Sequence, residues 1–429
     1  MDVTDVLTLS EPPRATRINA QPLDYQPRRA DRPLPIRYMP QLDALRALAV
    51  FAVWFEHWGI KDLPGFRYVP WGQFGVWLFF VLSGFLITGI LLRARESVER
   101  TRQAGSPGGL WAAARSFYAR RFLRILPIYY ITLFVTVFVL HYPGMRQVFW
   151  WHLAYATNFR VALHGRPFPD QGGIHFWTLA VEEQFYLLWP ALILLVPRRH
   201  VLKPIFLALA GALIFRVVCV LAQERPAASV WPFACFDLFA FGAALAAFGD
   251  SARYQRSGAA FCRWCARLGT PALLLLLIAA AWHLRQGTPH MLAVNVLLDP
   301  LAAGAVFAAL IARTARGFTG VGKAVLEFKP LLYLGKISYG LYIYHNFIQR
   351  PLWRLYDRLH VAPPGNIWIE FAIRAAATIL VASVSWYLIE KPINSLKKFF
   401  EYAKPVASKP GTVSAQCLPP PAPVPDAAA

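Results

Sequence analysis

The chain has 429 residues, of which 57% are apolar, 15% are aromatic and only 16% are charged. An average soluble protein has about 25% charged residues, so this composition excludes a disordered chain, a disulfide scaffold and an ordinary soluble enzyme, and it favours a polytopic membrane protein. The net charge of +21 fits either nucleic-acid binding or basic cytoplasmic loops, so the positions of the 44 basic residues decide between the two.

The two ends of the chain differ in composition from the region between them. Residues 1–39 are polar and rich in Pro and Arg, and they lack the order of basic, apolar and small residues that marks a signal peptide. We expect them to form a disordered cytoplasmic arm. Residues 401–429 are rich in Pro and Ala and have little to bury, which predicts a disordered tail. Residues 40–400 are expected to form the membrane domain.

Apolar stretches recur between these two ends. A helix that crosses a bilayer needs about 20 residues, and ten stretches come close to that length or exceed it. The sequence therefore predicts an all-α integral membrane protein, a bundle of about ten transmembrane helices. The predicted spans are residues 40–58, 72–92, 125–141, 176–197, 204–222, 232–249, 271–285, 292–312, 332–350 and 368–389.

The distribution of basic residues orients this bundle. With the N-terminus in the cytoplasm, 30 of the 44 Lys and Arg residues fall in cytoplasmic segments, and the other 14 fall in outside loops or within spans. Every predicted cytoplasmic loop follows the positive-inside rule, and an even number of spans places both termini in the cytoplasm. The positive charge thus belongs to membrane topology, and no nucleic-acid partner is expected.

Two ionisable residues share one face of the first predicted span. Arg46 and His57 are eleven residues apart, which is about three helical turns and a rise of about 16 Å. A charged group in a membrane helix costs at least about 2.5–3.5 kcal/mol, so each one requires a reason. Asp43 can form a structural ion pair with Arg46, and His57 can be a buried histidine that a neighbour satisfies. The functional alternative places Arg46 in the inner half of the span and His57 near its outer end.

Two adjacent carboxyl groups lie near the start of the fourth span. Glu182 and Glu183 point about 100° apart on a helix, so they are not expected to act as a paired-carboxylate site. One is expected to face the bundle and the other a pore, loop or partner. Glu182 and His57 fall at similar predicted depth, and a carboxylate can orient a histidine base through its second nitrogen. Contact between these two residues is therefore a prediction.

Basic residues mark the inner end of the third span. Arg120, Arg121 and Arg124 stand there, and Arg121 and Arg124 share a helical face. Positive-inside anchoring explains most such arginines. The functional alternative is a cytoplasmic site for phosphate groups, which guanidinium groups bind well.

Other polar groups carry less information. Ser338 and His345 in the ninth span are about 10 Å apart along the helix axis, too far for a serine–histidine hydrogen bond, so His345 is expected to pack between helices or line a pore. Cys262 and Cys265 form a CxxC pair with no two further ligands nearby, and no metal site is predicted. The aromatic residues of segment 142–175 suit either a membrane interface or stacking on a sugar.

Six motifs occur in a fixed order along the chain. They are Arg46 with His57 eleven residues later, Phe79-Phe80-Val81-Leu82-Ser83-Gly84-Phe85, Arg121-Phe122-Leu123-Arg124, Trp177-Thr178-Leu179-Ala180-Val181-Glu182-Glu183-Gln184-Phe185-Tyr186, Gly335 to His345, and Glu390-Lys391-Pro392-Ile393. In this order the chain resembles the acyltransferase-3 family, the integral membrane acyltransferases that include bacterial O-antigen and other surface-sugar O-acetylases. The resemblance covers about residues 38–400.

The resemblance implies a ten-helix bundle that uses acyl-CoA, usually acetyl-CoA, as donor and a carbohydrate as acceptor. It makes His57 the general base for the acceptor hydroxyl, with Glu182 orienting or tuning it. The remaining site residues follow from the same motifs. Arg121 and Arg124 would hold donor phosphates, Arg46 would line the donor route, Ser83 would allow close approach, and Trp177, Glu183, Tyr186 and His345 would contact substrate.

Two other functions remain open at this point. One is a transporter or flippase in which Arg46, His57, Glu182 and Lys336 serve an ion or substrate path. The other is acylation of a small hydrophobic glycoside or macrolide in place of a surface glycan. For the acyltransferase we expect a multi-pass protein of a bacterial inner membrane whose partners are membrane lipid, acyl-CoA and a carbohydrate, with no metal.

Overall fold

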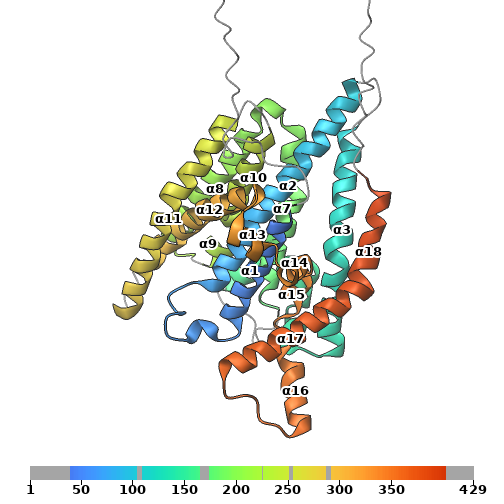
Figure 1. The fold of residues 1–429 in the computed structure, drawn as a ribbon, viewed down its shortest axis with the longest axis vertical. Coiled ribbons are helices and arrows are strands. Elements are labelled where there is room, and N and C mark those ends of the chain that lie inside the picture. The colour runs from blue at the N-terminus through green and yellow to red at the C-terminus, as the bar shows by residue number, and fades with distance from the viewer. Residues whose placement is uncertain are drawn as a thin grey trace, which may run out of the picture. The chain divides into compact units, whose positions relative to one another are not determined.

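The computed structural model describes residues 39–103, 109–164, 173–224, 226–250, 255–286 and 291–401. They belong to a unit that comprises residues 33–429. Within the described ranges every regular element is a helix, which confirms the all-α prediction (Figure 1). Apart from Met39 and Glu401, the predicted arm and the predicted tail lie outside the described residues.

Eight segments of the described chain are helices long and apolar enough to cross a membrane. They contain 20 to 33 residues each, and a helical span needs about 20. These segments coincide for most of their length with the helices α2 (Trp71–Gln103), α3 (Leu110–Phe134), α7 (Phe176–Leu195), α8 (Leu202–Leu221), α10 (Pro232–Asp250), α11 (Gln255–Gln286), α12 (Met291–Ala315) and α17 (Ile367–Ser385). They match eight of the ten predicted spans.

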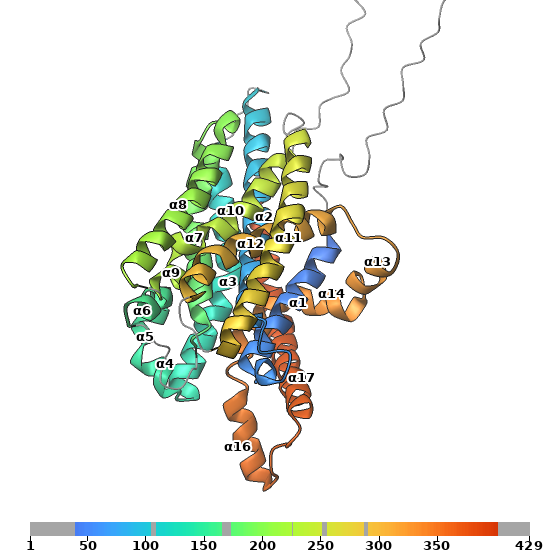
Figure 2. The ribbon, with the colours of Figure 1, turned by 90° about the vertical axis from the view of Figure 1, so that its left-hand side faces the viewer.

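The first predicted span forms α1 (Pro40–His57), which packs against α2 and α14 (Lys329–Lys336) (Figure 2). Its 18 residues include Asp43, Arg46 and Glu56, and this charge makes it less apolar than the eight segments. Half of its residues are buried, among them Trp54, which is fully buried. Protein neighbours therefore surround much of α1, and a charged residue that faces protein costs less free energy than one that faces lipid.

The ninth predicted span, residues 332–350, is divided into short helices. The chain forms α14, then α15 (Ser338–Tyr344) after a break at Ile337, and then α16 (Gln349–Leu359). The end of α14 lies directly on α1, because a Cβ atom at Gly335 would stand 1.9 Å from the carbonyl oxygen of Asp43. α16 carries three arginines and buries no residue, so it is unsuited to a bilayer interior. The prediction of one continuous helix here was wrong.

Close contact between α2 and α10 forms the centre of the unit. A Cβ atom at Gly84 would stand 2.0 Å from the carbonyl oxygen of Phe239. One at Gly242 would stand 1.9 Å from the carbonyl oxygen of Val81. Small residues allow membrane helices to approach in this way. The rings of Phe80 and Phe239 stack beside the crossing, with centroids 4.7 Å apart.

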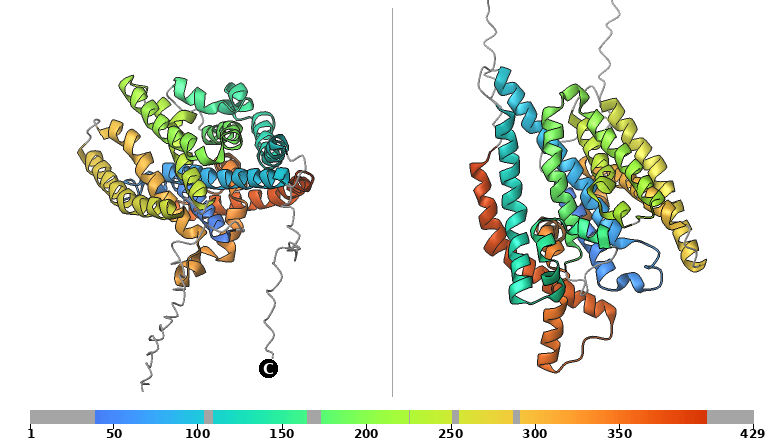
Figure 3. Two further views of the ribbon diagram at one scale, coloured as in Figure 1. Left: turned by 90° about the horizontal axis from the view of Figure 1, so that it is seen from above. Right: turned by 180° about the vertical axis from the view of Figure 1, so that it is seen from behind.

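Helices α11 and α12 lie at one edge of the unit, and α3 and α18 (Lys391–Ser395) lie at the opposite edge (Figure 3). The connections contain α4 (Pro143–Gln147), α5 (Phe149–Leu153), α6 (Thr157–His164), α9 (Ala227–Val230), α13 (Gly320–Leu326), η2 (Ile60–Asp62), η3 (Val135–Val139), η4 (Arg198–His200), η6 (Trp386–Glu390) and η7 (Leu396–Phe399). In the aromatic connection between α3 and α7, Trp150 is exposed and His152 is buried.

Candidate active site

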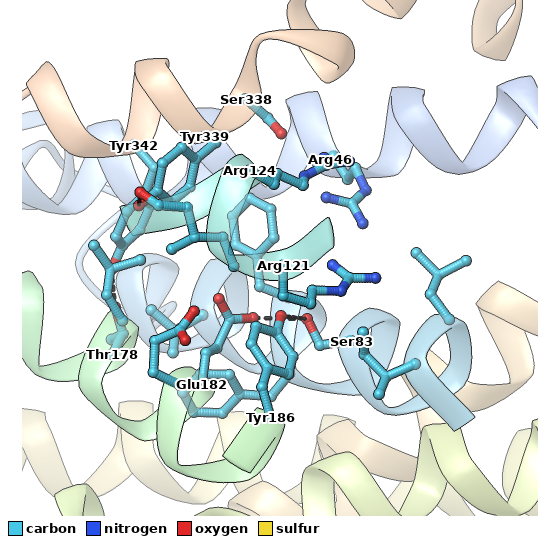
Figure 4. Close-up of a pocket in the computed structure, with 18 residues that line it drawn as sticks. Arg46, Ser83, Arg121, Arg124, Thr178, Glu182, Tyr186, Ser338, Tyr339 and Tyr342 are labelled. Atoms are coloured by element: carbon cyan, nitrogen blue, oxygen red, sulfur yellow. Dashed lines mark hydrogen bonds between the residues drawn. The ribbon is translucent and has the colours of Figure 1, made fainter. Parts of the chain in front are cut away.

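Side chains from α1, α2, α3, α7 and α15 enclose a pocket of about 60 Å³ (Figure 4). We call it the arginine pocket. Residues from five separate parts of the sequence meet in it, so the motifs that are distant along the chain form one site. Seven of the predicted site residues line it: Arg46, Ser83, Arg121, Arg124, Glu182, Glu183 and Tyr186.

Hydrogen bonds fix one carboxyl group of this pocket. Ser83 donates its hydroxyl to Oε1 of Glu182 at 2.7 Å (Figure 4). The oxygen of Ser83 is also 3.0 Å from the hydroxyl of Tyr186, and because Ser83 has only one hydroxyl proton, Tyr186 is the donor in that bond. The second-span and fourth-span motifs are thus joined through a single serine.

The arginine pocket holds more basic than acidic groups. Arg121 and Arg124 enter from α3 and Arg46 from α1, while Glu182 and Glu183 enter from α7. The guanidinium carbon of Arg121 lies 5.4 Å from the centre of the Tyr186 ring, close enough for a cation–π interaction. Three guanidinium groups against two carboxyl groups favour an anionic ligand.

Arg120 has a different position from its two neighbours in the motif. Its Nη1 atom donates to the carbonyl oxygens of Lys397 at 3.0 Å and Phe400 at 3.3 Å. It therefore ties α3 to the segment that follows α18 and does not enter the arginine pocket. This difference agrees with the helical phase, because Arg121 and Arg124 share a face that Arg120 does not.

A second cavity, of about 980 Å³, contains His57. We call it the histidine cavity. Trp77 and Trp177 supply aromatic walls, so of the four residues predicted to contact substrate, Trp177 lies here and not in the arginine pocket. Polar side chains in the cavity wall include Glu56, Lys61, Arg216, Asn295 and Asp299. Arg216 forms a buried ion pair with Asp237.

Two further histidines surround His57. The ring centroids of His345 and His57 are 5.1 Å apart, and those of His175 and His345 are 4.8 Å apart. His345 is fully buried, and its Nδ1 atom donates to the carbonyl oxygen of Tyr342 at 2.6 Å. A neutral His345 then carries its lone pair on Nε2, a buried atom that has no hydrogen-bond partner among the described residues.

His175 is neutral and its tautomer is defined. It lies just before α7, where burial and the nearby His57 lower its pKa to about 3. Its Nε2 atom donates to the carbonyl oxygen of Ile343 at 3.0 Å, and its Nδ1 atom accepts from the side-chain amide of Asn346 at 3.1 Å. These bonds hold the ring in one orientation beside His345.

The structure does not bring Glu182 to His57. The two side chains line different cavities, and Glu182 is bonded to Ser83. Glu182 lies one turn beyond Thr178 on α7, about 6 Å further along the helix, at the level of the arginines. Counting residues from the ends of predicted spans fixes depth only to within about a turn, so it could not separate the two cavities.

Both carboxyl groups of the fourth-span motif line the arginine pocket, although the sequence predicted that only one would face such a site.

The residues that the sequence analysis missed are His175, Tyr342 and Asn346, which complete the surroundings of His57 and His345. A signal for them was present, because His175 directly precedes the fourth-span motif and Tyr342 lies within the motif that ends at His345.

The arginine pocket and the histidine cavity are neighbours. Val76, Thr178 and Tyr342 line both of them. A pocket lined by three arginines therefore adjoins a cavity lined by His57. No group of three His, Cys, Asp or Glu residues that could hold a metal ion occurs in the described part of the chain.

Comparison with known proteins agrees with the motif order. The family model of an acyltransferase domain matches residues 39–390. The peptidoglycan O-acetyltransferase OatA of Listeria monocytogenes is 29% identical over 391 residues, which cover 86% of the chain and 57% of that protein. A Bacillus subtilis protein, YrhL, with a provisional peptidoglycan O-acetyltransferase name, is 28% identical over 400 residues, which cover 84% of the chain and 55% of that protein.

The chain spans little more than half the length of these relatives. No solved structure matches it. The region matched by the family model includes every residue that lines the arginine pocket and the histidine cavity. Together with its helices of membrane-spanning length, this match shows that the chain is a multi-pass membrane protein that belongs to the acyltransferase-3 family.

Proposed function

We propose that this chain is a membrane O-acyltransferase. It transfers an acyl group, chiefly acetyl, from cytoplasmic acyl-CoA to a sugar hydroxyl in a surface or lipid-linked glycan. The observation that carries the proposal is the shared wall between the arginine pocket and the histidine cavity. The excess of basic residues on one side of the predicted bundle supports an orientation with the arginine pocket towards the cytoplasm, and the membrane we propose is a bacterial inner membrane.

The arginine pocket suits the donor. Guanidinium groups bind phosphate groups in a bidentate manner, and CoA carries several phosphates. The volume of about 60 Å³ decides which part of the donor enters, because pockets for drug-sized ligands measure about 300–1,000 Å³. The acyl thioester fits inside, while the nucleotide stays at the cytoplasmic mouth with its phosphates near Arg46, Arg121 and Arg124.

The histidine cavity suits a sugar acceptor. Its volume of about 980 Å³ is at the upper end of the range for ligand pockets. Trp77 and Trp177 offer aromatic faces for a sugar ring, and Asn295 and Asp299 offer polar groups for hydroxyls. The names of both relatives refer to peptidoglycan, and we propose a glycan sugar as the acceptor here.

His57 is the proposed general base. A neutral sugar hydroxyl is a poor nucleophile until a base takes its proton, and a positioned base contributes about 10²- to 10⁴-fold. The acceptor oxygen bonds to the acyl carbon while the carbon–sulfur bond of the thioester breaks. The proton passes from the hydroxyl to His57 and then to the sulfur. The products are a sugar ester and free CoA thiol.

The test is label transfer in membrane vesicles. We expect label from acetyl-CoA to appear in peptidoglycan fragments with the wild-type protein, and His57→Gln to reduce this at least 100-fold because the base is lost. His360→Gln is the matched control, since His360 is exposed at the end of α16. Full transfer by His57→Gln would refute the mechanism. Label that appears only in an added hydrophobic alcohol would favour an enzyme that acylates small molecules. Label that appears in no acceptor would favour the transporter.

A further inference from the structure

The wall between the two cavities is one side chain thick. Val76 from α2, Thr178 from α7 and Tyr342 from α15 each line both the arginine pocket and the histidine cavity. Only 8%, 4% and 6% of their surfaces are exposed, so they lie inside the protein and not at its surface. We call these three residues the partition.

Hydrogen bonds hold the partition closed. The hydroxyl groups of Thr178 and Tyr342 both bond the carbonyl oxygen of His175, at 2.8 Å and 3.3 Å, and their oxygens are 2.5 Å apart. The ring of Tyr342 packs edge-on against Phe79, with centroids 5.9 Å apart. The partition contains no charged side chain. It therefore suits a neutral acyl group and opposes the passage of phosphate groups.

The proposed reaction requires an acyl group to reach the partition. The donor phosphates stay with the arginines, while the acyl carbon must meet the acceptor oxygen near His57 in the adjoining cavity. Separation of Tyr342 from Thr178 opens the only stretch of wall that the described linings of these two cavities share. The size of the gap depends on the side chains that remain around it.

We propose that the partition selects the acyl group by length. It admits acetyl and rejects chains that are longer by one or more methylene groups. This inference rests on the proposed function. Protein interiors are packed as densely as organic crystals, so an added methylene must displace a buried side chain. A single methylene in such a site changes specificity by about 10- to 200-fold.

The test compares donors of increasing length. Purified full-length protein in proteoliposomes would receive acetyl-, propionyl- or butyryl-CoA with peptidoglycan fragments as acceptor, and kcat/KM would be measured for each donor. Val76→Ala and Thr178→Ser both remove methyl groups from the partition, and Thr178→Ser keeps the hydroxyl. We expect each to raise the propionyl-to-acetyl ratio of kcat/KM about tenfold.

A matched control removes the same atoms elsewhere. Val81→Ala makes the same change on α2 at a fully buried position that lines neither cavity. It should leave the propionyl-to-acetyl ratio at the wild-type value. If all three variants keep the wild-type ratio while acetyl transfer continues, the partition does not select acyl length and the proposed function stands. If the wild-type protein transfers no acyl group from any donor, both the function and the inference are contradicted.

Discussion

Ser83 connects two motifs through one hydroxyl group, which bonds both Glu182 and Tyr186. Ser83→Ala leaves the buried carboxyl group without this partner, and a hydrogen bond to a charged group is worth about 1.5–3 kcal/mol. We therefore predict that kcat/KM for acetyl-CoA falls about 10- to 100-fold. Ser116→Ala is the control, because Ser116 is buried but lines neither cavity. Equal activity of the two variants would exclude this role.

His345 belongs to the surroundings of His57, not to the arginine pocket. Its Nε2 atom, which has no hydrogen-bond partner in the described part of the chain, is an acceptor beside the proposed base, and a second group often orients a catalytic histidine in this way. We predict that His345→Phe, which keeps a planar ring, lowers kcat at least tenfold and leaves KM for acetyl-CoA within about twofold. A rise in KM for the donor with unchanged kcat would place His345 in donor binding instead.

The sequence predicted which arginines share a helix face, but it did not predict the hydrogen-bond partner of Glu182. Helical phase placed Arg121 and Arg124 on one face, and in the structure both line the arginine pocket, whereas Arg120 does not. Phase and spacing describe one helix at a time, however, and they do not say which helix lies opposite. Glu182 was therefore paired with His57, whereas in the structure the hydroxyl of Ser83 bonds it.

At the scale of elements, the crossing of α2 and α10 depends on two glycines. A Cβ atom at Gly84 would stand 2.0 Å from a backbone carbonyl oxygen that cannot move away alone. Overpacking of this kind costs about 1–3 kcal/mol or more, so we predict that Gly84→Ala lowers the apparent melting temperature by several degrees. In Gly211→Ala the new methyl group meets nothing within 4 Å. Equal apparent melting temperatures of the two variants in detergent would contradict the close approach of α2 and α10.

The connection between α3 and α7 should weaken in acid. Burial lowers the pKa of His152 to about 3, whereas an unfolded histidine has a pKa of about 6.5. Between these values the unfolded chain binds more protons, so stability falls as the pH falls through this window. We predict a lower apparent melting temperature at pH 5 than at pH 7.5, and a smaller drop in His152→Gln. An identical drop in both proteins would assign the acid sensitivity to other groups.

The ninth span shows that apolar length alone does not predict a break within a helix. Apolar length predicted a single helix over residues 332–350, but length does not report a break such as the one at Ile337. The close contact of Gly335 with the backbone of α1 is a tertiary feature. The arginines of α16 were visible in the sequence and are the signal that could have ended the predicted span earlier.

At the scale of the whole molecule, composition and charge were the most informative properties. They predicted a helical membrane protein, and eight of the ten expected spans are helices of sufficient length and apolarity. They could not predict two adjoining cavities, because a cavity depends on packing between helices that are distant in sequence. The proposed function draws on that arrangement: charge for the donor in one cavity, and a base for the acceptor in the other.

The most direct test of this account is the sidedness of acyl transfer. Proteoliposomes with the protein in one known orientation would receive labelled acetyl-CoA on one side and peptidoglycan fragments on the other. The account predicts labelled acceptor only when the donor is on the side of the arginine pocket and the acceptor is on the side of the histidine cavity. Transfer that requires donor and acceptor on the same side, or transfer in either arrangement, would contradict it.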